Sequence, residues 1–198
     1  LWGRWQPHRR VQLIAAAPFT FNNRQYEDGS SLHSHGLGDA TLLAQFALLD
    51  PKKQLIKRWS HTLQVGVGTQ LPTGRTNITD AEGDLLNSNI QPGAGVVAPL
   101  FSALYAIRYR SWGVSADATA RVGKENEVGY EFGNRMSTNL RFFKTITAGK
   151  FTLLPHVGAL ADLRKKDRDQ GSLLAERGGY SVFGTAGMDV FRGNFILG

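Results

Sequence analysis

Residues 59–71 read WSHTLQVGVGTQL, and this stretch decides the fold class of the chain. Its odd positions carry mostly large or apolar side chains, while every even position is Ser, Thr, Gln or Gly. Successive side chains of a β-strand point to opposite faces, so alternation with period 2 predicts a strand with one apolar and one polar face.

The same alternation recurs along the chain and defines eight strand-like segments. They span residues 11–21, 40–48, 59–71, 101–109, 112–122, 130–142, 151–163 and 180–190. A ninth begins near Phe195, and Ser111 alone separates the fourth and fifth, which predicts a tight hairpin. Helical periodicity is missing over any comparable length, so the fold class is all-β with antiparallel neighbours.

Composition narrows the function classes. The 198 residues include 23 Lys+Arg against 16 Asp+Glu, for a net charge of +7, and no Cys, which excludes a disulfide scaffold, a thiolate metal site and a Cys nucleophile. With 41% hydrophobic residues, the chain is too apolar for a disordered protein. Its longest apolar runs fall short of the roughly 18 residues of a membrane-spanning helix, whereas barrel strands hide their lipid face in alternation.

The connections between the segments alternate in length. Long or polar connections at 22–36, 72–93, 123–129 and 165–179 alternate with shorter ones at 50–58, 110–112, 144–150 and 191–194. Long loops at one end, short turns at the other and strands of about ten residues are typical of outer-membrane β-barrels. We expect residues 1–198 to form one up-and-down transmembrane β-barrel domain in the outer membrane of a Gram-negative bacterium.

Both ends of the chain suggest that the intact protein is longer. The first residues lack the basic, apolar and small-residue pattern of a secretory signal, which an exported protein needs. The last residues read as the opening of a strand. Because bacterial barrels have even strand numbers, we expect ten to twelve strands in the intact protein.

Aromatic side chains with the apolar parity gather toward the two ends of the segments, as the two membrane interfaces would select. The predicted belt residues are Trp5, Trp59, Trp112, Phe142, Phe151, Tyr130, Phe132 and Tyr180. The first five are assigned to the turn end and the last three to the loop end. A soluble β-sandwich or lipocalin-like barrel with an aromatic core is the alternative.

The opposite parity carries charge of both signs. The candidate lumen residues are Arg108, Arg121, Arg135, Arg141, Arg164, Asp39, Asp117 and Asp162. They have two interpretations: Arg–carboxylate pairs that fill a narrow lumen, or a water-filled pore that is biased toward anions. We favour charge pairing with a small constricted path, and residues 72–93, as the longest loop, are the candidate gate.

Two short motifs, Gly36-Leu37-Gly38-Asp39 and Leu71-Pro72-Thr73-Gly74-Arg75, resemble those of a family of bacterial outer-membrane transporter-like barrels. That family carries the label of a putative meta-pathway phenol-degradation or transporter family. The resemblance covers about the first half of the chain by motif and implies a barrel that carries an aromatic or hydrophobic solute. From the residues themselves, a structural role for both motifs is favoured, since glycine and proline mark turns and close approaches.

Histidine offers weak candidates for other chemistry. His33 and His35 have the same parity in the first long loop, so a surface metal site is conceivable there, although no third ligand such as Asp28 can be assigned. The alternative is a solvated loop tip. Ser34 with His35 is the nearest approach to the catalytic group of a rim hydrolase acting on lipid, and we expect no enzyme activity and no cofactor.

Basic side chains also collect at the turn end, where an acidic periplasmic partner, anionic lipid headgroups or solvent are the candidate recipients. They are Lys52, Lys53, Lys57, Arg58, Lys144, Lys150 and Arg192, against Asp50. Nucleic acid is not an expected partner. The sequence therefore predicts a passive outer-membrane channel for a small solute in contact with lipid, or alternatively an anchoring barrel subunit of a cell-envelope complex.

Overall fold

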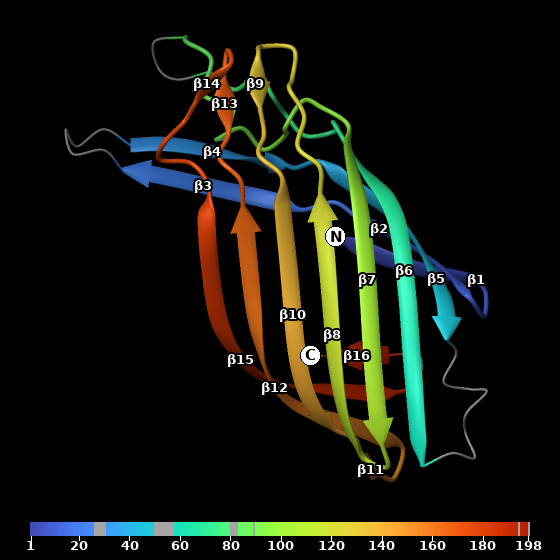
Figure 1. Cartoon of the computed structure of the whole chain (residues 1–198). Coiled ribbons are helices and arrows are strands. Elements are labelled where there is room, and N and C mark those ends of the chain that lie inside the picture. Colours follow the sequence, from blue (N-terminus) through green and yellow to red (C-terminus); the bar gives the residue numbers. More distant parts are fainter. Residues whose placement is uncertain (26–30, 50–57, 80–82, 89, 194, 198) are drawn as a thin grey trace.

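The computed structural model describes residues 1–25, 31–49, 58–79, 83–88, 90–193 and 195–197. One large antiparallel sheet dominates it (Figure 1). Its strands, in spatial order, are β1 (Trp2–His8), β2 (Val11–Ala16), β5 (Ala40–Leu49), β6 (Trp59–Leu71), β7 (Ala98–Tyr109), β8 (Trp112–Arg121), β10 (Arg135–Lys144), β12 (Phe151–Arg164), β15 (Gly179–Arg192) and β16 (Phe195–Leu197). The prediction of an all-β antiparallel fold is confirmed.

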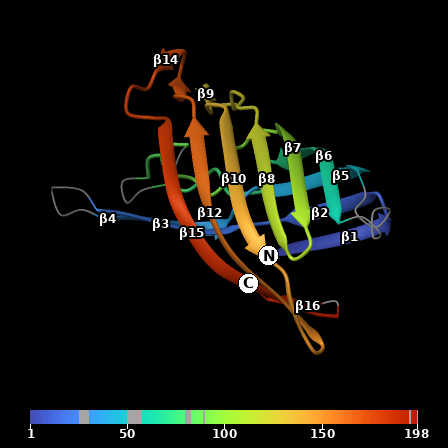
Figure 2. The ribbon, with the colours of Figure 1, turned by 60° about the horizontal axis from the view of Figure 1, so that its bottom comes forward.

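The sheet curls strongly but does not close on itself. Figures 1 and 2 show β1, β2 and β5 passing behind the central strands, which makes an open trough. No hydrogen-bonded pairing joins β1 to β16 in the described part of the chain, so a closed barrel is not observed. None of the described residues belongs to a helix long and apolar enough to cross a membrane.

The predicted strand over residues 11–21 is wrong, because the chain breaks at Ala17–Pro18 into β2 and β3 (Phe19–Gln25). The β3 strand pairs with β4 (Ser31–Leu37) in a separate two-stranded sheet, so the predicted loop 22–36 is largely a β-hairpin. The carbonyl of Pro18 accepts a hydrogen bond from the amide of Gly38 at 2.8 Å, and this contact closes the hairpin at its base. The strand β1 was not among the eight predicted segments.

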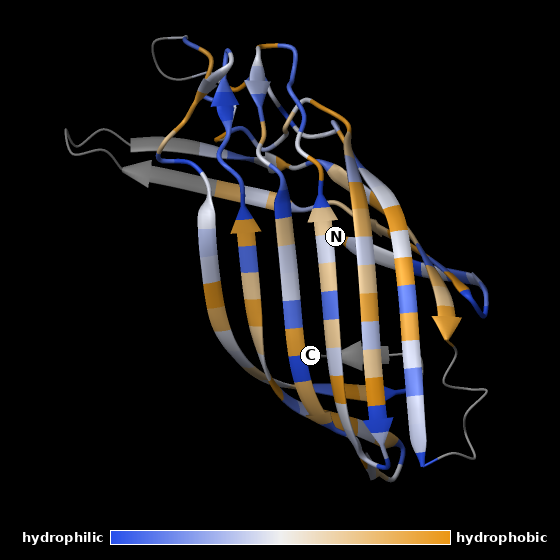
Figure 3. Ribbon diagram, in the orientation of Figure 1, coloured by the Kyte–Doolittle hydropathy of each residue, from blue (hydrophilic) through white to orange (hydrophobic). Residues whose placement is uncertain are grey.

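Register aligns the alternating residues into rows across the sheet. One row on the apolar face runs Trp5, Leu13, Ala44, Val67, Phe101, Ala120, Met136, Leu163 and Tyr180. The neighbouring row on the other face runs Gln12, Gln45, Gly66, Ser102, Thr119, Ser137, Asp162 and Ser181. Figure 3 shows the resulting alternation of hydrophobic and hydrophilic bands along the strands.

The apolar face is the convex, exposed one. Val67 is 54% exposed and Phe101 is 51% exposed, whereas Gly66 and Ser102 on the concave face are buried or half-buried. Glycine makes the concave curvature possible at β6, because a Cβ on Gly68 would collide with the carbonyl of Leu42 on β5. Apolar side chains therefore face out and polar ones face in, which is the inverse of a soluble barrel.

Proline sets a second irregularity. Pro155 has no amide hydrogen to donate, and the register of β12 places it opposite Lys144, at the end of β10. The neighbouring strand is interrupted at Thr145 and resumes as β11 (Ile146–Ala148), which pairs with β12. On its other side the ladder to β8 continues, since the amide of Thr145 donates to the carbonyl of Ser111 at 2.6 Å.

The connections beyond β8 and β12 fold together at one end of the sheet. They form a small three-stranded sheet of β9 (Tyr130–Glu131), β13 (Arg168–Asp169) and β14 (Ser172–Leu173). Tyr130 and Phe132 pack edge to face beneath it, with ring centroids 4.9 Å apart, and are 2% and 7% exposed. Their assignment to an outer aromatic belt is therefore wrong, because both rings are buried in the core of the folded loops.

A buried carboxylate organises this loop core. Asp167 is fully buried and accepts hydrogen bonds from the Tyr130 hydroxyl, the Gly133 amide and the Arg164 guanidinium, each at 2.7 Å. Burial, together with the hydrogen bond to Asp167 and the charge of this carboxylate, raises the pKa of Tyr130 to about 12. The phenol must therefore stay protonated for the loop core to persist.

This pKa predicts an alkaline transition. The pKa of Tyr130 is higher in the folded state than its unfolded value of 10.0, so the protonated phenol stabilises the fold below pH 10. This stabilisation is lost as the pH rises toward about 12. The wild-type chain should lose unfolding free energy between pH 10 and about 12. In Tyr130→Phe this loss should be smaller by up to about 3 kcal/mol. Unfolding followed by far-UV circular dichroism at stepped pH measures it, with Tyr180→Phe as control. Equal pH dependence in both variants would contradict the role of Tyr130.

Candidate functional site

The concave face carries a polar network that crosses several strands. The Gln12 amide donates to Gln45 at 3.3 Å, and Gln45 donates to the Ser102 hydroxyl at 3.4 Å. Further along, Asn139 donates to the Asp117 carboxylate at 3.2 Å. Side chains of the polar rows thus satisfy one another across strands.

Ion pairs account for part of the charge on this face. Arg135 pairs with Asp162 at 2.9 Å, and Arg141 lies 3.7 Å from Asp189. Arg164 pairs with Asp167. These contacts agree with the charge-pairing interpretation of the predicted lumen residues. Register places Arg108 on the same face, opposite Gly113.

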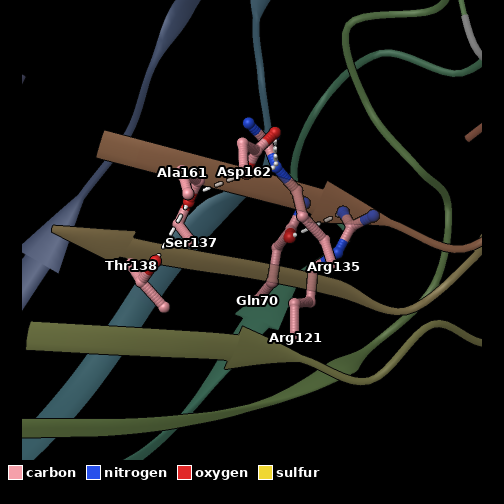
Figure 4. A network of polar contacts seen from close by, with 7 residues as sticks. All are labelled: Gln70, Arg121, Arg135, Ser137, Thr138, Ala161 and Asp162. Atoms are coloured by element: carbon pink, nitrogen blue, oxygen red, sulfur yellow. Dashed lines mark hydrogen bonds and ion pairs between the residues drawn. The ribbon is translucent and has the colours of Figure 1, made fainter. Parts of the chain in front are cut away.

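Three arginines lie side by side near the loop end of the trough. In the register, Arg135 on β10 is the direct partner of both Arg121 on β8 and Arg164 on β12. Like charges directly opposite each other destabilise a sheet, so such a row requires compensation. Figure 4 shows Arg121 reaching across the trough to the side-chain oxygen of Gln70, which accepts its hydrogen bond at 3.2 Å.

Compensation of this row is incomplete. Arg135 and Arg164 each have a carboxylate partner, whereas the hydrogen-bond acceptor of Arg121 is the neutral Gln70. The Nε atoms of Arg121 and Arg164 are buried, and within the described part of the chain neither has an acceptor. Arg121 also lies over the ring of Phe132, with its Cζ 5.8 Å from the ring centroid.

A cavity of about 170 Å³ opens at this arginine row. Its polar walls include Asp39, Gln70, Gln91, Arg121, Arg135 and Arg164. Residues 91–94, from the connection between β6 and β7, cover it on the loop side. The predicted lumen residues Asp39, Arg121, Arg135 and Arg164 therefore meet in one place, whereas Arg108, Arg141 and Asp117 lie elsewhere on the concave face.

Asp39 is buried and joins the two glycine-rich motifs. Its carboxylate accepts hydrogen bonds from the amides of Gly74 and Ala94 at 2.9 and 2.8 Å, and from the Gln70 side chain at 2.9 Å. The Thr73 hydroxyl accepts from the Ala40 amide at 2.8 Å. Asp39 is thus a structural acceptor for three donors, and its assignment as a selectivity residue stays a prediction.

The connection between β6 and β7 is folded rather than open. The Gln91 amide binds both backbone groups of Ile78 and the carbonyl of Leu86, at 2.9 to 3.1 Å. The Ser34 hydroxyl donates to the carbonyl of Ile90 at 2.7 Å and fastens this segment to β4. Leu86 and Ile90 are buried. We name residues 72–97 the cap.

A second cavity lies on the other side of the cap. It measures about 300 Å³ and is lined by residues of the cap together with Asn126, Glu127 and Val128. Four residues, Ser88, Gln91, Gly93 and Ala94, line both this cavity and the arginine cavity. Between the two cavities the cap is therefore a wall one segment thick.

Four of the predicted turn-end belt residues, Trp59, Trp112, Phe142 and Phe151, make aromatic or cation–π contacts. Trp112 stacks on Phe142 with centroids 5.2 Å apart, and Trp59 lies 4.6 Å from Tyr109 by the same measure. The Lys144 ammonium lies over the Trp112 ring and the Arg192 guanidinium over that of Phe151, at 4.8 and 5.3 Å from the centroids. These contacts place cations among exposed rings.

Trp5 does not lie with these residues at the turn end. The register aligns it with Leu13 and, through the rows of the sheet, with Tyr180 at the other end of β15, because β1 and β2 are displaced along the sheet. Both side chains are exposed on the convex face, at 65% and 82%. The turn-end basic residues 52, 53 and 57, and Asp50, lie outside the described residues.

The histidine candidates gain no support. His35 is exposed on β4 and stacks near Phe21, with centroids 6.5 Å apart, while the side chain of His33 and all of Asp28 lie outside what is described. No group of three potential metal ligands occurs among the described residues. Ser34 faces the opposite side of β4 from His35, so the two do not form a catalytic pair.

Sequence reasoning missed Asp167, Gln70 and Gln91, which hold the loop core, the arginine row and the cap. Asp167 lies in a run of charged residues, KKDRD, where a buried carboxylate cannot be distinguished from solvated ones. Gln70 had the concave parity and was a usable signal. Comparison of the chain with protein-family models and with curated proteins gives no match. The family resemblance therefore stays a prediction that rests on the two motifs.

Asp39→Ala should loosen the cap without unfolding the sheet. It leaves the amides of Gly74 and Ala94 without their acceptor, at a cost of roughly 2–4 kcal/mol in local stability. Amide hydrogen exchange at these two residues should accelerate more than about tenfold. Asp117→Ala, which removes a concave carboxylate distant from the cap, is the matched control. Unchanged exchange in Asp39→Ala would contradict the assigned role.

Proposed function

We propose that the chain is the barrel of a passive outer-membrane channel for a small solute, without catalysis. The observation that carries this proposal is the inverted polarity of the sheet. Its convex face exposes row after row of large apolar side chains, while its concave face holds a half-buried polar network. Soluble monomers rarely expose contiguous apolar patches beyond a few hundred Å², and a lipid bilayer is the solvent that suits such a face.

The dimensions of the sheet support the same proposal. The central strands run from 10 to 14 residues, from β8 and β10 to β12 and β15. About 9–11 tilted residues cross the hydrocarbon core. The aromatic and cationic contacts of Trp59, Trp112 and Lys144 fit the interface at the turn end, where aromatic rings and basic groups meet lipid headgroups.

Transport requires a path through the trough, and the cap is its constriction in this proposal. The cap separates two cavities by a single segment that Asp39 and Ser34 hold in place. The concave ion pairs leave a narrow lumen once the barrel is closed. Closure joins the sheet edges in the bilayer, because unpaired backbone groups are not tolerated in lipid.

A second candidate function is an anchoring barrel subunit of a cell-envelope complex. The observation that favours it is the density of contacts that hold the cap over the trough, which suits a plugged lumen. Its partner would meet the basic turn end, where the half-buried Lys144 and the exposed Arg192 lie over aromatic rings.

Leu140→Lys tests the membrane part of the proposal. Leu140 is 54% exposed near the middle of β10 on the convex face. In a bilayer midplane the lysine should cost about 2–4 kcal/mol and reduce the fraction that folds into lipid vesicles. In a soluble protein, the same exposed substitution would leave stability unchanged within about 0.5 kcal/mol. Leu140→Met is the control, and equal vesicle insertion of both variants would rule out a lipid-facing β10.

Conductance distinguishes the two candidate functions. The chain refolded into a planar bilayer should give discrete single-channel steps if the trough becomes a path. Asp39→Ala, which frees the cap, should raise the conductance or the open fraction, whereas Asp117→Ala should leave the cap in place. Inserted protein that stays silent in all three forms would reject the channel and leave the anchoring role.

A further inference from the structure

The row of Arg121, Arg135 and Arg164 is more than a set of structural ion pairs. Arg121 lines the polar cavity at one end of the row, and in the described part of the chain no carboxylate forms an ion pair with it. The nearby carboxylate of Asp39 is turned to two backbone amides and the Gln70 side chain. Arg121 thus brings a positive charge that the chain leaves without a direct counterion.

The hydrogen-bonding balance of the row shows the same deficit. Each guanidinium has five N–H donors and no acceptor. Arg164 places one nitrogen on Asp167 and Arg121 places one on Gln70, while the Nε of each is buried without an acceptor among the described residues. Unsatisfied buried donors are costly, so the arginine row that lines the cavity is short of acceptors within the described residues.

We propose that the cavity under the cap is a binding site for a small oxyanion, held by Arg121, Arg135 and Arg164. The shape agrees with this class of ligand: about 170 Å³ with polar walls admits a phosphate or a short carboxylate and leaves no room for a large organic group. Planar guanidinium groups recognise such anions through paired N–H···O bonds.

Surrounding residues keep the arginines in position for this role. Asp162 holds Arg135 through two contacts at 2.9 and 3.1 Å, and the Ser137 hydroxyl donates to the same carboxylate at 2.7 Å (Figure 4). The ring of Phe132 backs Arg121. The row is therefore fixed from behind by the sheet and by the loop core, while its remaining donors stand at the cavity.

The cap gives the site a direction of access. Gln91, Gly93 and Ala94 separate the arginine cavity from the outer cavity of about 300 Å³. In this proposal an anion reaches the arginines through the cap, past an outer cavity that Glu127 also lines. The inference that the bound anion is also the transported solute rests on the proposed function. The inference that the site binds an anion does not.

Equilibrium binding of inorganic phosphate tests the site directly. Titration calorimetry of the full chain, folded in detergent micelles at constant ionic strength, should show saturable binding of one phosphate per chain. Chloride at the same ionic strength should give none. Absence of saturable phosphate binding to the wild-type chain, or an equal response to chloride, would overturn the proposal.

Matched variants assign the binding to the row. Arg121→Gln should weaken phosphate binding at least tenfold, while Arg10→Gln, which removes the same charge at the β1–β2 turn, should leave it within twofold. Arg121→Lys keeps the charge but not the planar fork and should fall between them. Far-UV circular dichroism checks that each variant folds. Equal weakening in Arg121→Gln and Arg10→Gln would reduce the effect to net charge and reject the site.

Conductance separates failure of this proposal from failure of the channel. A chain that binds phosphate but shows no single-channel steps keeps the anion site and loses the channel. A chain that conducts without saturable phosphate binding keeps the channel and loses the site.

Discussion

The structure depends on cross-strand register, because one residue of slip would exchange the two faces of every strand. Apolar rows such as the one through Leu13, Val67 and Phe101 stay on the convex face over nine strands, and the polar row through Gln45 and Ser102 stays on the concave face. The hydrogen bonds inside the trough require this alignment. So does Gly68, where a Cβ would collide with the carbonyl of Leu42. Polarity and curvature are therefore set together, and the arginine row is one product of the same register.

Two carboxylates extend this order from the sheet into its connections. Asp39 gathers backbone amides from both ends of the cap, and Asp167 gathers a phenol, an amide and a guanidinium in the loop core. Both are buried and both accept three hydrogen bonds, so each adds a polar centre to the buried apolar residues of its connection. Arg121 lies between them, facing the cap on one side and the ring of Phe132 on the other.

Period-2 alternation was sufficient to predict the antiparallel all-β fold, the tight hairpin between β7 and β8, and the parity of the residues that meet at the arginine cavity. It failed where the chain leaves the sheet: Pro18 ends β2, and the apolar alternation that continues through Phe19 and Phe21 belongs to the separate hairpin β3–β4. The belt assignment of Tyr130 and Phe132 failed because parity cannot tell an exposed ring from one that a folded loop covers. Glycine-rich motifs at 36–39 and 71–75 were recognised, but their meeting through Asp39 is a long-range contact that no local pattern reports.

Each strand of the main sheet pairs with its neighbour along the chain, apart from the detours of β3–β4 and of the small loop sheet. Such a meander pairs strands that mostly follow one another along the chain, so it can grow by adding one hairpin after another without searching among competing strand orders. The two steps that close longer segments are β2 to β5, across the β3–β4 hairpin, and β6 to β7, across the cap. The entropy cost of closing a loop rises only slowly with its length. Asp39, which directly follows the β3–β4 hairpin, also binds both ends of the cap. The two longest closures of the sheet therefore meet at a single carboxylate.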